Sequence, residues 1–173
     1  MLKIHRKLEY ALLALQHMRM VGATAGADRL VTARELCGIH PMPFDVLSKV
    51  LQRLARCGVL ASAQGAQGGY RLRADLRRYS LYDLSEALVG PMRFANCMDE
   101  RCDCQLTGSC TVISAVVNLA KRVERLYREV SVDELLESEE VHDEREIRER
   151  FTRSQQAMSL MAGITAAGPV QSP

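Results

Sequence analysis

A stretch in the first half of the chain constrains the fold more strongly than any other part of the sequence. Thr32 and Glu35 form a capping box, in which the hydroxyl and the carboxylate accept hydrogen bonds from amides that a helix start leaves unpaired. The prolines of residues 41–43 then break the chain. Residues 44–57 follow with an apolar face, and Gly58 stands at the position of a C-terminal cap. Two helices joined by a tight turn predict a helix-turn-helix.

A hairpin is predicted directly after the second of these helices. Residues 59–63 and 70–73 are short strand-like stretches, and the glycine-rich residues 64–69 between them allow a tight turn. A hairpin in this place is the wing of a winged helix-turn-helix, which reads DNA. The side chains expected to face DNA from the second helix and the wing are Asp45, Ser48, Lys49, Gln52, Arg53, Gln64, Gln67, Arg71 and Arg73.

The net charge of +2 hides an asymmetry between the two halves of the chain. Residues 1–90 carry 13 Lys and Arg against 7 Asp and Glu, whereas residues 91–173 carry 10 against 14. The first half is therefore the half expected to bind a polyanion such as double-stranded DNA.

Four cysteines lie within residues 97–110, namely Cys97, Cys102, Cys104 and Cys110. Cysteines at this density indicate a metal ion, an iron–sulfur cluster or a redox-active thiol site, because soft thiolates bind soft metals and are readily oxidised. Cys37 and Cys57 lie on the predicted helix-turn-helix and are interpreted as small buried hydrophobes.

The N-terminal residues are basic and then apolar, as in a signal peptide, but they keep helical spacing and are interrupted by polar side chains. We therefore expect an amphipathic helix over residues 7–21 in a cytoplasmic protein that does not bind a membrane. In a reducing cytoplasm, cysteines are poor disulfide candidates and better metal or sensor candidates.

A second long helix is predicted after the cysteines. Its apolar residues alternate by four and three, a period typical of a helix that pairs with another helix. They are Val112, Val116, Leu119, Val123, Leu126 and Val130. We interpret this helix as a homodimer contact, and the alternative is a helix packed on its own domain. Ser131 and Glu134 form another capping box, which begins a short helix.

The predicted fold is thus mainly α with a small β wing: a winged helix-turn-helix DNA-binding domain and a long dimerisation helix. The DNA-binding domain takes residues 1–90, the cysteine-rich loop 91–110 and the dimerisation helix 111–136, and a charged, then flexible tail takes 137–173. The sequence contains no nucleophile–base motif and no phosphate-binding loop, so neither an enzyme nor a small-molecule substrate is expected.

Over roughly residues 1–136 the chain resembles the IscR/NsrR/RirA family of bacterial winged-helix regulators, the Rrf-two type. The resemblance is carried by residues 7–12, by residues 47–60 and, most specifically, by the wing sequence QGAQGGYRL at residues 64–72. It implies a homodimer that binds inverted-repeat DNA. It also implies, in the cluster-binding members, a 2Fe-2S or 4Fe-4S cluster held by three cysteines.

The resemblance assigns Cys97, Cys104 and Cys110 as cluster ligands, since Cys104 and Cys110 have the family's five-residue gap. Cys102 is surplus: it is either an alternative ligand during cluster rearrangement or an inert exposed thiol. In NsrR-like members a carboxylate of the partner subunit, immediately before a tyrosine, completes the site, and Glu9 takes that place here.

Two residues depart from the family pattern. Gln64 replaces the usual wing arginine, which puts the family's DNA preference in doubt, and Ile113 replaces the histidine ligand of IscR-like members.

We interpret the cysteines as an iron–sulfur sensor of nitric oxide, oxygen, redox state or iron supply, and three other interpretations stay open. They are a four-thiolate zinc site, a metal-free thiol switch and an iron–sulfur electron carrier.

Overall fold

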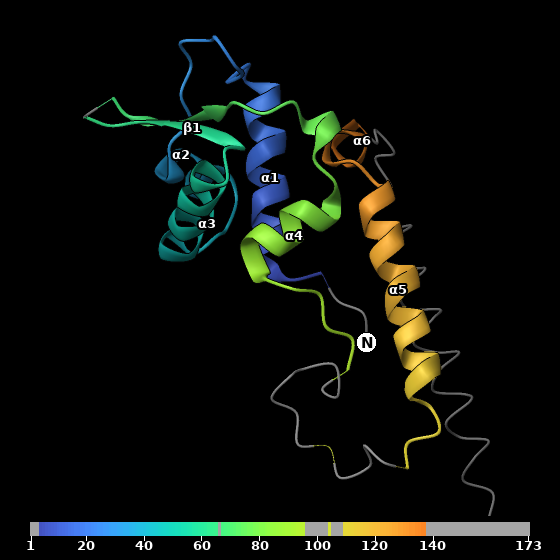
Figure 1. Cartoon of the computed structure of the whole chain (residues 1–173). Coiled ribbons are helices and arrows are strands. Elements are labelled where there is room, and N and C mark those ends of the chain that lie inside the picture. The colour runs from blue at the N-terminus through green and yellow to red at the C-terminus, as the bar shows by residue number, and fades with distance from the viewer. Residues whose placement is uncertain (1–3, 66, 96–103, 105–108, 138–173) are drawn as a thin grey trace, which may run out of the picture. The chain divides into compact units, whose positions relative to one another are not determined.

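The computed structural model describes residues 4–65, 67–95, 104 and 109–137 of the chain (Figure 1). All of the described elements belong to one unit, Met1–Ser138. In chain order they are α1 (Arg6–Met20), α2 (Ala33–Ile39), α3 (Phe44–Arg56), β1 (Leu60–Ala63), β2 (Gly69–Leu72), the 3-10 helix η1 (Leu76–Arg78), α4 (Leu81–Val89), α5 (Ile113–Glu129) and α6 (Val132–Glu137). Cys97, Cys102 and the predicted tail from residue 138 onward lie outside the described residues.

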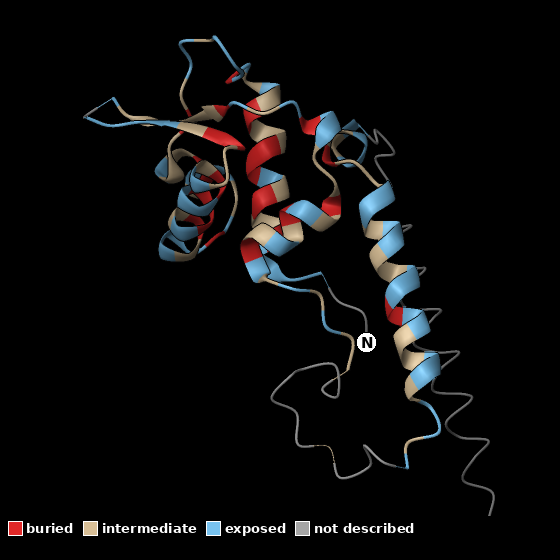
Figure 2. Ribbon diagram, in the orientation of Figure 1, coloured by how far each residue is buried: buried red, intermediate tan, exposed pale blue. Residues whose placement is uncertain are grey.

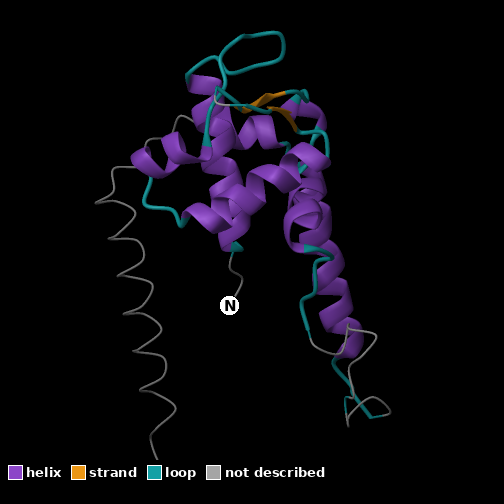
Figure 3. Ribbon diagram, turned by 90° about the vertical axis from the view of Figure 1, so that its left-hand side faces the viewer, coloured by secondary structure: helices purple, strands orange, loops and turns teal. Residues whose placement is uncertain are grey.

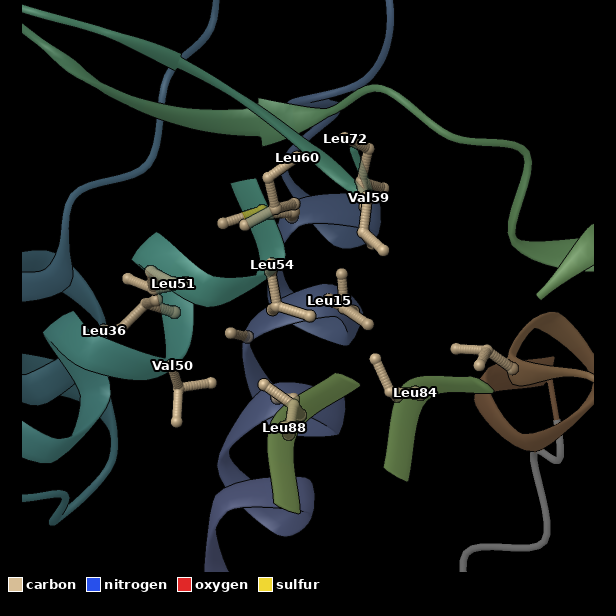
Figure 4. Close-up of a cluster of buried hydrophobic side chains, with 14 of the residues drawn as sticks. Leu15, Leu36, Val50, Leu51, Leu54, Val59, Leu60, Leu72, Leu84 and Leu88 are labelled. Atoms are coloured by element: carbon tan, nitrogen blue, oxygen red, sulfur yellow. The ribbon is translucent and has the colours of Figure 1, made fainter. Parts of the chain in front are cut away.

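Helix α1 is the centre of the hydrophobic core. It buries one side chain or more on every turn, because its apolar residues recur three and four positions apart. Helices α3 and α4 pack on it (Figures 1 and 2). Leu15 lies in the middle of the cluster, among Leu54 of α3 and Leu84 and Leu88 of α4 (Figure 4). Burying each such leucine stabilises the fold by about 1.5–3 kcal/mol.

The helix-turn-helix forms where the sequence predicts it. Thr32 Oγ1 accepts a hydrogen bond from the Glu35 amide at 3.0 Å and begins α2. Gly58 ends α3 with φ of 79°, a left-handed conformation that a glycine adopts without a steric penalty. The capping box at Thr32 is only half formed, however. The Glu35 carboxylate turns away from the helix start and pairs with His17 and Arg29 instead.

The predicted wing is an antiparallel hairpin of β1 and β2, in which Leu60 pairs with Leu72 and Ser62 with Tyr70. Positions 68 and 69 must be glycine, because neighbouring backbone atoms leave no space for a Cβ atom there. A Cβ atom at Gly68 would lie 2.4 Å from the carbonyl oxygen of Ala63, and one at Gly69 would lie 2.9 Å from that of Val31. Figure 3 shows these two strands against an otherwise helical unit, so the predicted fold class is confirmed.

Helices α5 and α6 follow the cysteine segment. The C-terminal part of α5 is attached to α4, where the Arg128 guanidinium carbon lies 3.6 Å from the centroid of the Tyr82 ring. Helix α6 is attached to α1, because Arg19 Nη1 lies 3.1 Å from Asp133 Oδ1. The predicted cap of α6 is present, with the Glu134 amide donating to Ser131 Oγ at 3.1 Å. No helix in the described part of the chain is long and apolar enough to cross a membrane.

Candidate nucleic-acid interface and cysteine segment

Helix α3 divides cleanly into a buried side and an exposed side. Leu47, Val50, Leu51 and Leu54 are buried on α1. A helix turns by about 100° per residue, so Asp45, Lys49 and Gln52 lie on the opposite side, where the structure leaves them exposed. Ser48 is half-buried at one edge of that side. The structure thus brings together four of the five α3 residues that the sequence predicts to face DNA.

Arg53 is the fifth predicted α3 residue, and its guanidinium points toward the protein. Its Nε donates to the backbone carbonyl of Ala87 at 2.7 Å, which joins α3 to α4. A guanidinium that is held by a carbonyl on a neighbouring helix is less available to a phosphate than one in solvent. In this structure Arg53 therefore links two helices of the core.

The hairpin separates the predicted wing residues into two groups. Gln64 and Gln67 lie in the exposed turn between the strands. Arg71 lies within β2, and its Nη1 donates to the carbonyl of Ala27 at 2.8 Å, in the loop after α1. Arg73 follows the other end of β2 and lines a cavity of about 790 Å³ with Arg19 and residues 74–77. The structure does not bring the two arginines to the turn of the wing.

Two residues of α3 were missed from the sequence. Arg56 lies four residues after Gln52, hence on the same exposed side, and the spacing alone could have found it. Phe44, the first residue of α3, has an exposed fraction of 50% although it is aromatic. An apolar side chain at the start of a helix that reads DNA can contact a thymine methyl group.

The described part of the cysteine segment contains Cys104 and Cys110, both half-buried reduced thiols. Their chemistry suits a soft metal, but no group of three His, Cys, Asp or Glu side chains within the described residues is close enough to hold an ion. Glu9 lies in the first turn of α1, where its carboxylate pairs with Arg6 at 3.1 Å. The structure thus does not bring Glu9 and these two thiols together within one chain.

The two cysteines of the helix-turn-helix are half-buried rather than fully buried. Cys37 packs against the core. Cys57 caps the C-terminus of α3, and its carbonyl accepts a hydrogen bond from the Tyr79 hydroxyl at 3.2 Å. The sequence predicts two buried hydrophobes; neither side chain is fully buried, and of the two only Cys37 packs against the core.

Helix α5 begins three residues after Cys110 and is amphipathic, yet Ala120 is its single buried residue. Three apolar side chains spaced by seven residues form an exposed stripe along it, since seven residues are close to two helical turns. These are Val112, which caps the helix, Leu119 and Leu126, with exposed fractions of 59%, 59% and 55%. Leu119 also lines an apolar cavity of about 610 Å³ with Leu8 and Val89.

A helix-turn-helix with an adjoining hairpin and a basic N-terminal half defines a DNA-binding protein of the winged-helix class. The model of the Rrf2 family, described as Iron-dependent Transcriptional regulator, matches residues 4–138. The chain belongs to this family and is a transcription regulator rather than an enzyme.

Relatives and solved structures agree with this assignment. A relative from Aquifex aeolicus (strain VF5), named as an HTH-type transcriptional regulator, is 26% identical over 137 residues, which cover 78% of this chain and 92% of the relative. The structure of T. potens IscR matches with a TM-score of 0.58 and 20% identity over 82% of this chain and 91% of that one. CymR, the global cysteine regulator of B. subtilis, matches with a TM-score of 0.57 and 18% identity over 79% and 97%. At these identities the two solved structures show a shared fold.

Proposed function

We propose that the protein is a cytoplasmic, homodimeric transcription regulator that binds an inverted-repeat operator under the control of an iron–sulfur cluster. The observation that carries this proposal is the exposed apolar stripe of α5, which begins directly after the cysteine segment. A helix with this stripe needs a partner, and a second copy of the chain would supply an identical stripe. The dimer contact, the cysteine segment and the DNA-reading helices are then consecutive parts of one chain.

Dimer formation is supported by the way α5 packs. Its C-terminal half contacts α4, where the Arg128 guanidinium stacks on the Tyr82 ring, and Ala120 is buried. The remaining apolar surface continues into the cavity beside Leu8 and Val89. Exposed contiguous apolar surface is uncommon on monomeric proteins and marks an interaction site.

A two-fold dimer places its two copies of the helix-turn-helix and wing on one face, so the half-sites should lie about one or more helical turns of DNA apart.

DNA recognition is assigned to the exposed side of α3 together with the turn of the wing. Ser48, Lys49 and Gln52 would reach base edges, because the first turns of the second helix enter the major groove. Gln64 and Gln67 would contact the adjacent groove or backbone. Asp45 at the helix start would accept a hydrogen bond from a cytosine amino group. The contribution of Arg53 and Arg71 is expected to be smaller, since each donates a hydrogen bond to a backbone carbonyl of its own chain. Arg73 is exposed at the end of β2 away from the turn and would contact the DNA backbone there.

The cluster is assigned to Cys97, Cys104 and Cys110, with Glu9 of the other copy as the fourth ligand and Cys102 as an alternative. Thiolates suit iron, and a carboxylate is a harder and weaker ligand that would leave one iron open to reaction. Such a cluster supplies a site that nitric oxide, oxygen or iron shortage alters. Loss of the cluster would then change the segment that joins α4 to α5 and shift the relative population of dimer conformations that bind the operator.

A cluster-free thiol or zinc sensor is the second candidate. The observation that favours it is that CymR, described as the global cysteine regulator of B. subtilis, shares the fold. The electron-carrier alternative would leave the helix-turn-helix and the wing without a role.

Anaerobic purification of the full chain tests the proposal. Iron and acid-labile sulfide are counted per chain, the visible spectrum is recorded during nitric oxide addition, and DNA is titrated before and after. We expect a chromophore that Ala replacement of Cys97, Cys104 or Cys110 abolishes and that Cys102→Ala largely retains. Glu9→Ala should shorten the lifetime of the cluster in air without altering DNA binding by the cluster-free form. Stoichiometric zinc without sulfide would instead establish the second candidate.

A further inference from the structure

A small pocket lies between the recognition helix and the wing. It has a volume of about 270 Å³ and is lined by Gln52, Ala55, Arg56, Ser62 and Tyr70. Ser62 and Tyr70 come from the two paired strands of the hairpin, and the other three residues come from the C-terminal half of α3. The pocket is therefore a product of the tertiary fold.

The register of the hairpin explains which side chains enter the pocket. Side chains alternate between the two faces of a strand, and the pairs Leu60–Leu72 and Ser62–Tyr70 share one face. Leu60 and Leu72 are buried in the core, so this face is the one that covers α3. The Ala61–Arg71 pair lies on the other face, which agrees with the bond from Arg71 to Ala27. Ser62 and Tyr70 are thereby fixed beside Arg56.

The polar groups around the pocket share one chemical property. The Arg56 guanidinium, the Ser62 and Tyr70 hydroxyls and the Gln52 amide can all donate hydrogen bonds. Within the described part of the chain, none of these side-chain groups has a hydrogen-bond or ion-pair partner. None of the lining residues carries a carboxylate. An unpaired cation surrounded by neutral donors favours an anion with several acceptor oxygens.

We propose that this pocket binds a phosphate of the DNA backbone and so fixes the angle between the recognition helix and the wing. The inference rests on the DNA binding proposed above and names the group that this junction contacts. A phosphate fits better than a base edge, because bases are reached from the start of the recognition helix, whereas the pocket lies at its C-terminal half. A bidentate guanidinium with a tyrosine and a serine hydroxyl matches the oxygens of a phosphodiester.

Single-residue variants test the pocket with a duplex that the wild-type dimer selects from a random pool. Arg56→Ala should weaken binding about tenfold and reduce the slope of log affinity against log salt by about 1. Tyr70→Phe removes one hydroxyl and keeps the ring on the core, so binding should weaken about threefold without a change in melting temperature. Arg125→Ala, which removes an equal charge from α5, and Tyr82→Phe, which removes a hydroxyl from α4, are the matched controls.

Methylphosphonate substitution locates the contact. Neutral linkages are introduced one at a time along a half-site, and affinity is measured for the wild type, Arg56→Ala and Tyr70→Phe. At one linkage per half-site the wild type should lose affinity while neither variant loses more. Equal additional losses of the variants at every linkage would overturn the phosphate assignment. A wild-type dimer that selects no duplex at all would instead contradict the proposed function.

Discussion

We call α1–α4 with the hairpin, residues 6–89, the reading head. Its helices and helix α5 are all amphipathic, but the two regions bury their apolar sides in different ways. In the head, α1 is surrounded by α3, α4 and the hairpin, and its five buried side chains have exposed fractions of 0–1%. Along α5, Ala120 alone is buried, and the side chains of Val112, Leu119 and Leu126 have exposed fractions of 55–59%. The head is thus covered by the described part of its own chain, whereas the described residues leave the apolar stripe of α5 exposed. We expect mutations in the two regions to change different measurable quantities.

The largest effect on stability is expected in the centre of the head. Leu15→Ala should lower the free energy of unfolding by about 3–4 kcal/mol, since it removes a fully buried side chain and leaves a cavity that the surrounding helices cannot fill. Urea unfolding followed by circular dichroism measures this loss. Leu13→Ala, on the exposed side of the same helix, is the control and should change stability by less than about 1 kcal/mol. Similar losses at both positions would contradict the central place of Leu15.

The second prediction concerns the apolar stripe of α5. Replacing Leu119 and Leu126 together by Asp should raise the dimer dissociation constant by about 100-fold or more, because it would bury unpaired carboxylates in the dimer contact. Analytical ultracentrifugation over a range of concentrations reports this change. The free energy of unfolding of the monomer should change little, since both side chains are exposed. Asn118→Asp adds a charge on another side of α5 and should leave the dimer intact.

The same contrast explains how much of the fold could be predicted from the sequence. Elements defined by local signals were predicted nearly to the residue: the Thr32 cap, the glycine after α3 and the cap of α6 all depend on neighbours within a few positions. The contacts of long polar side chains could not be predicted. Arg53 and Arg71 have the pattern of exposed residues, yet their partners Ala87 and Ala27 come close only through the tertiary fold.

The site was predicted to a corresponding degree. The exposed side of α3 follows from helical periodicity, and Arg56 would have followed from it too. The pocket at the junction with the wing could not, because it requires the strand register that places Tyr70 opposite Ser62. Assignment of the cysteines rests on spacing and on family resemblance, since Cys97 and Cys102 lie outside the described residues.

A third prediction concerns the connection between the two regions. Arg19 of α1 binds Asp133 at 3.1 Å and Glu137 at 3.4 Å, both on α6, which directly follows α5. Arg19→Ala should lower stability by only about 1 kcal/mol, because all three side chains are partly exposed. It should also speed hydrogen exchange of the amides of α6, measured by mass spectrometry, while those of α3 keep their protection. Equal acceleration in α3 would mean that α6 is an inseparable part of the core.

The smallest effect is expected from an ion pair within the head, where charge rather than burial joins two helices. His17 Nε2 of α1 lies 3.3 Å from Glu35 Oε1 of α2, and Arg29 pairs with the same carboxylate. Burial alone would raise the pKa of Glu35, but the hydrogen bond with His17 and the charge of Arg29 outweigh it and hold the pKa below its ordinary value. A carboxyl with a lowered pKa stabilises the folded state above the pKa it has in the unfolded chain, and this stabilisation is lost as the pH falls through its folded-state pKa.

Glu35→Gln should therefore lower the free energy of unfolding by about 0.5–1 kcal/mol at neutral pH, and the difference from the wild type should shrink toward zero in acid. Glu124→Gln, in the exposed pair with Arg128 on α5, should cost less at every pH, since solvent screens that pair more strongly. Urea unfolding at a series of pH values measures both variants, and a difference for Glu35→Gln that grows in acid would show that this carboxylate does not join α2 to α1 through its charge.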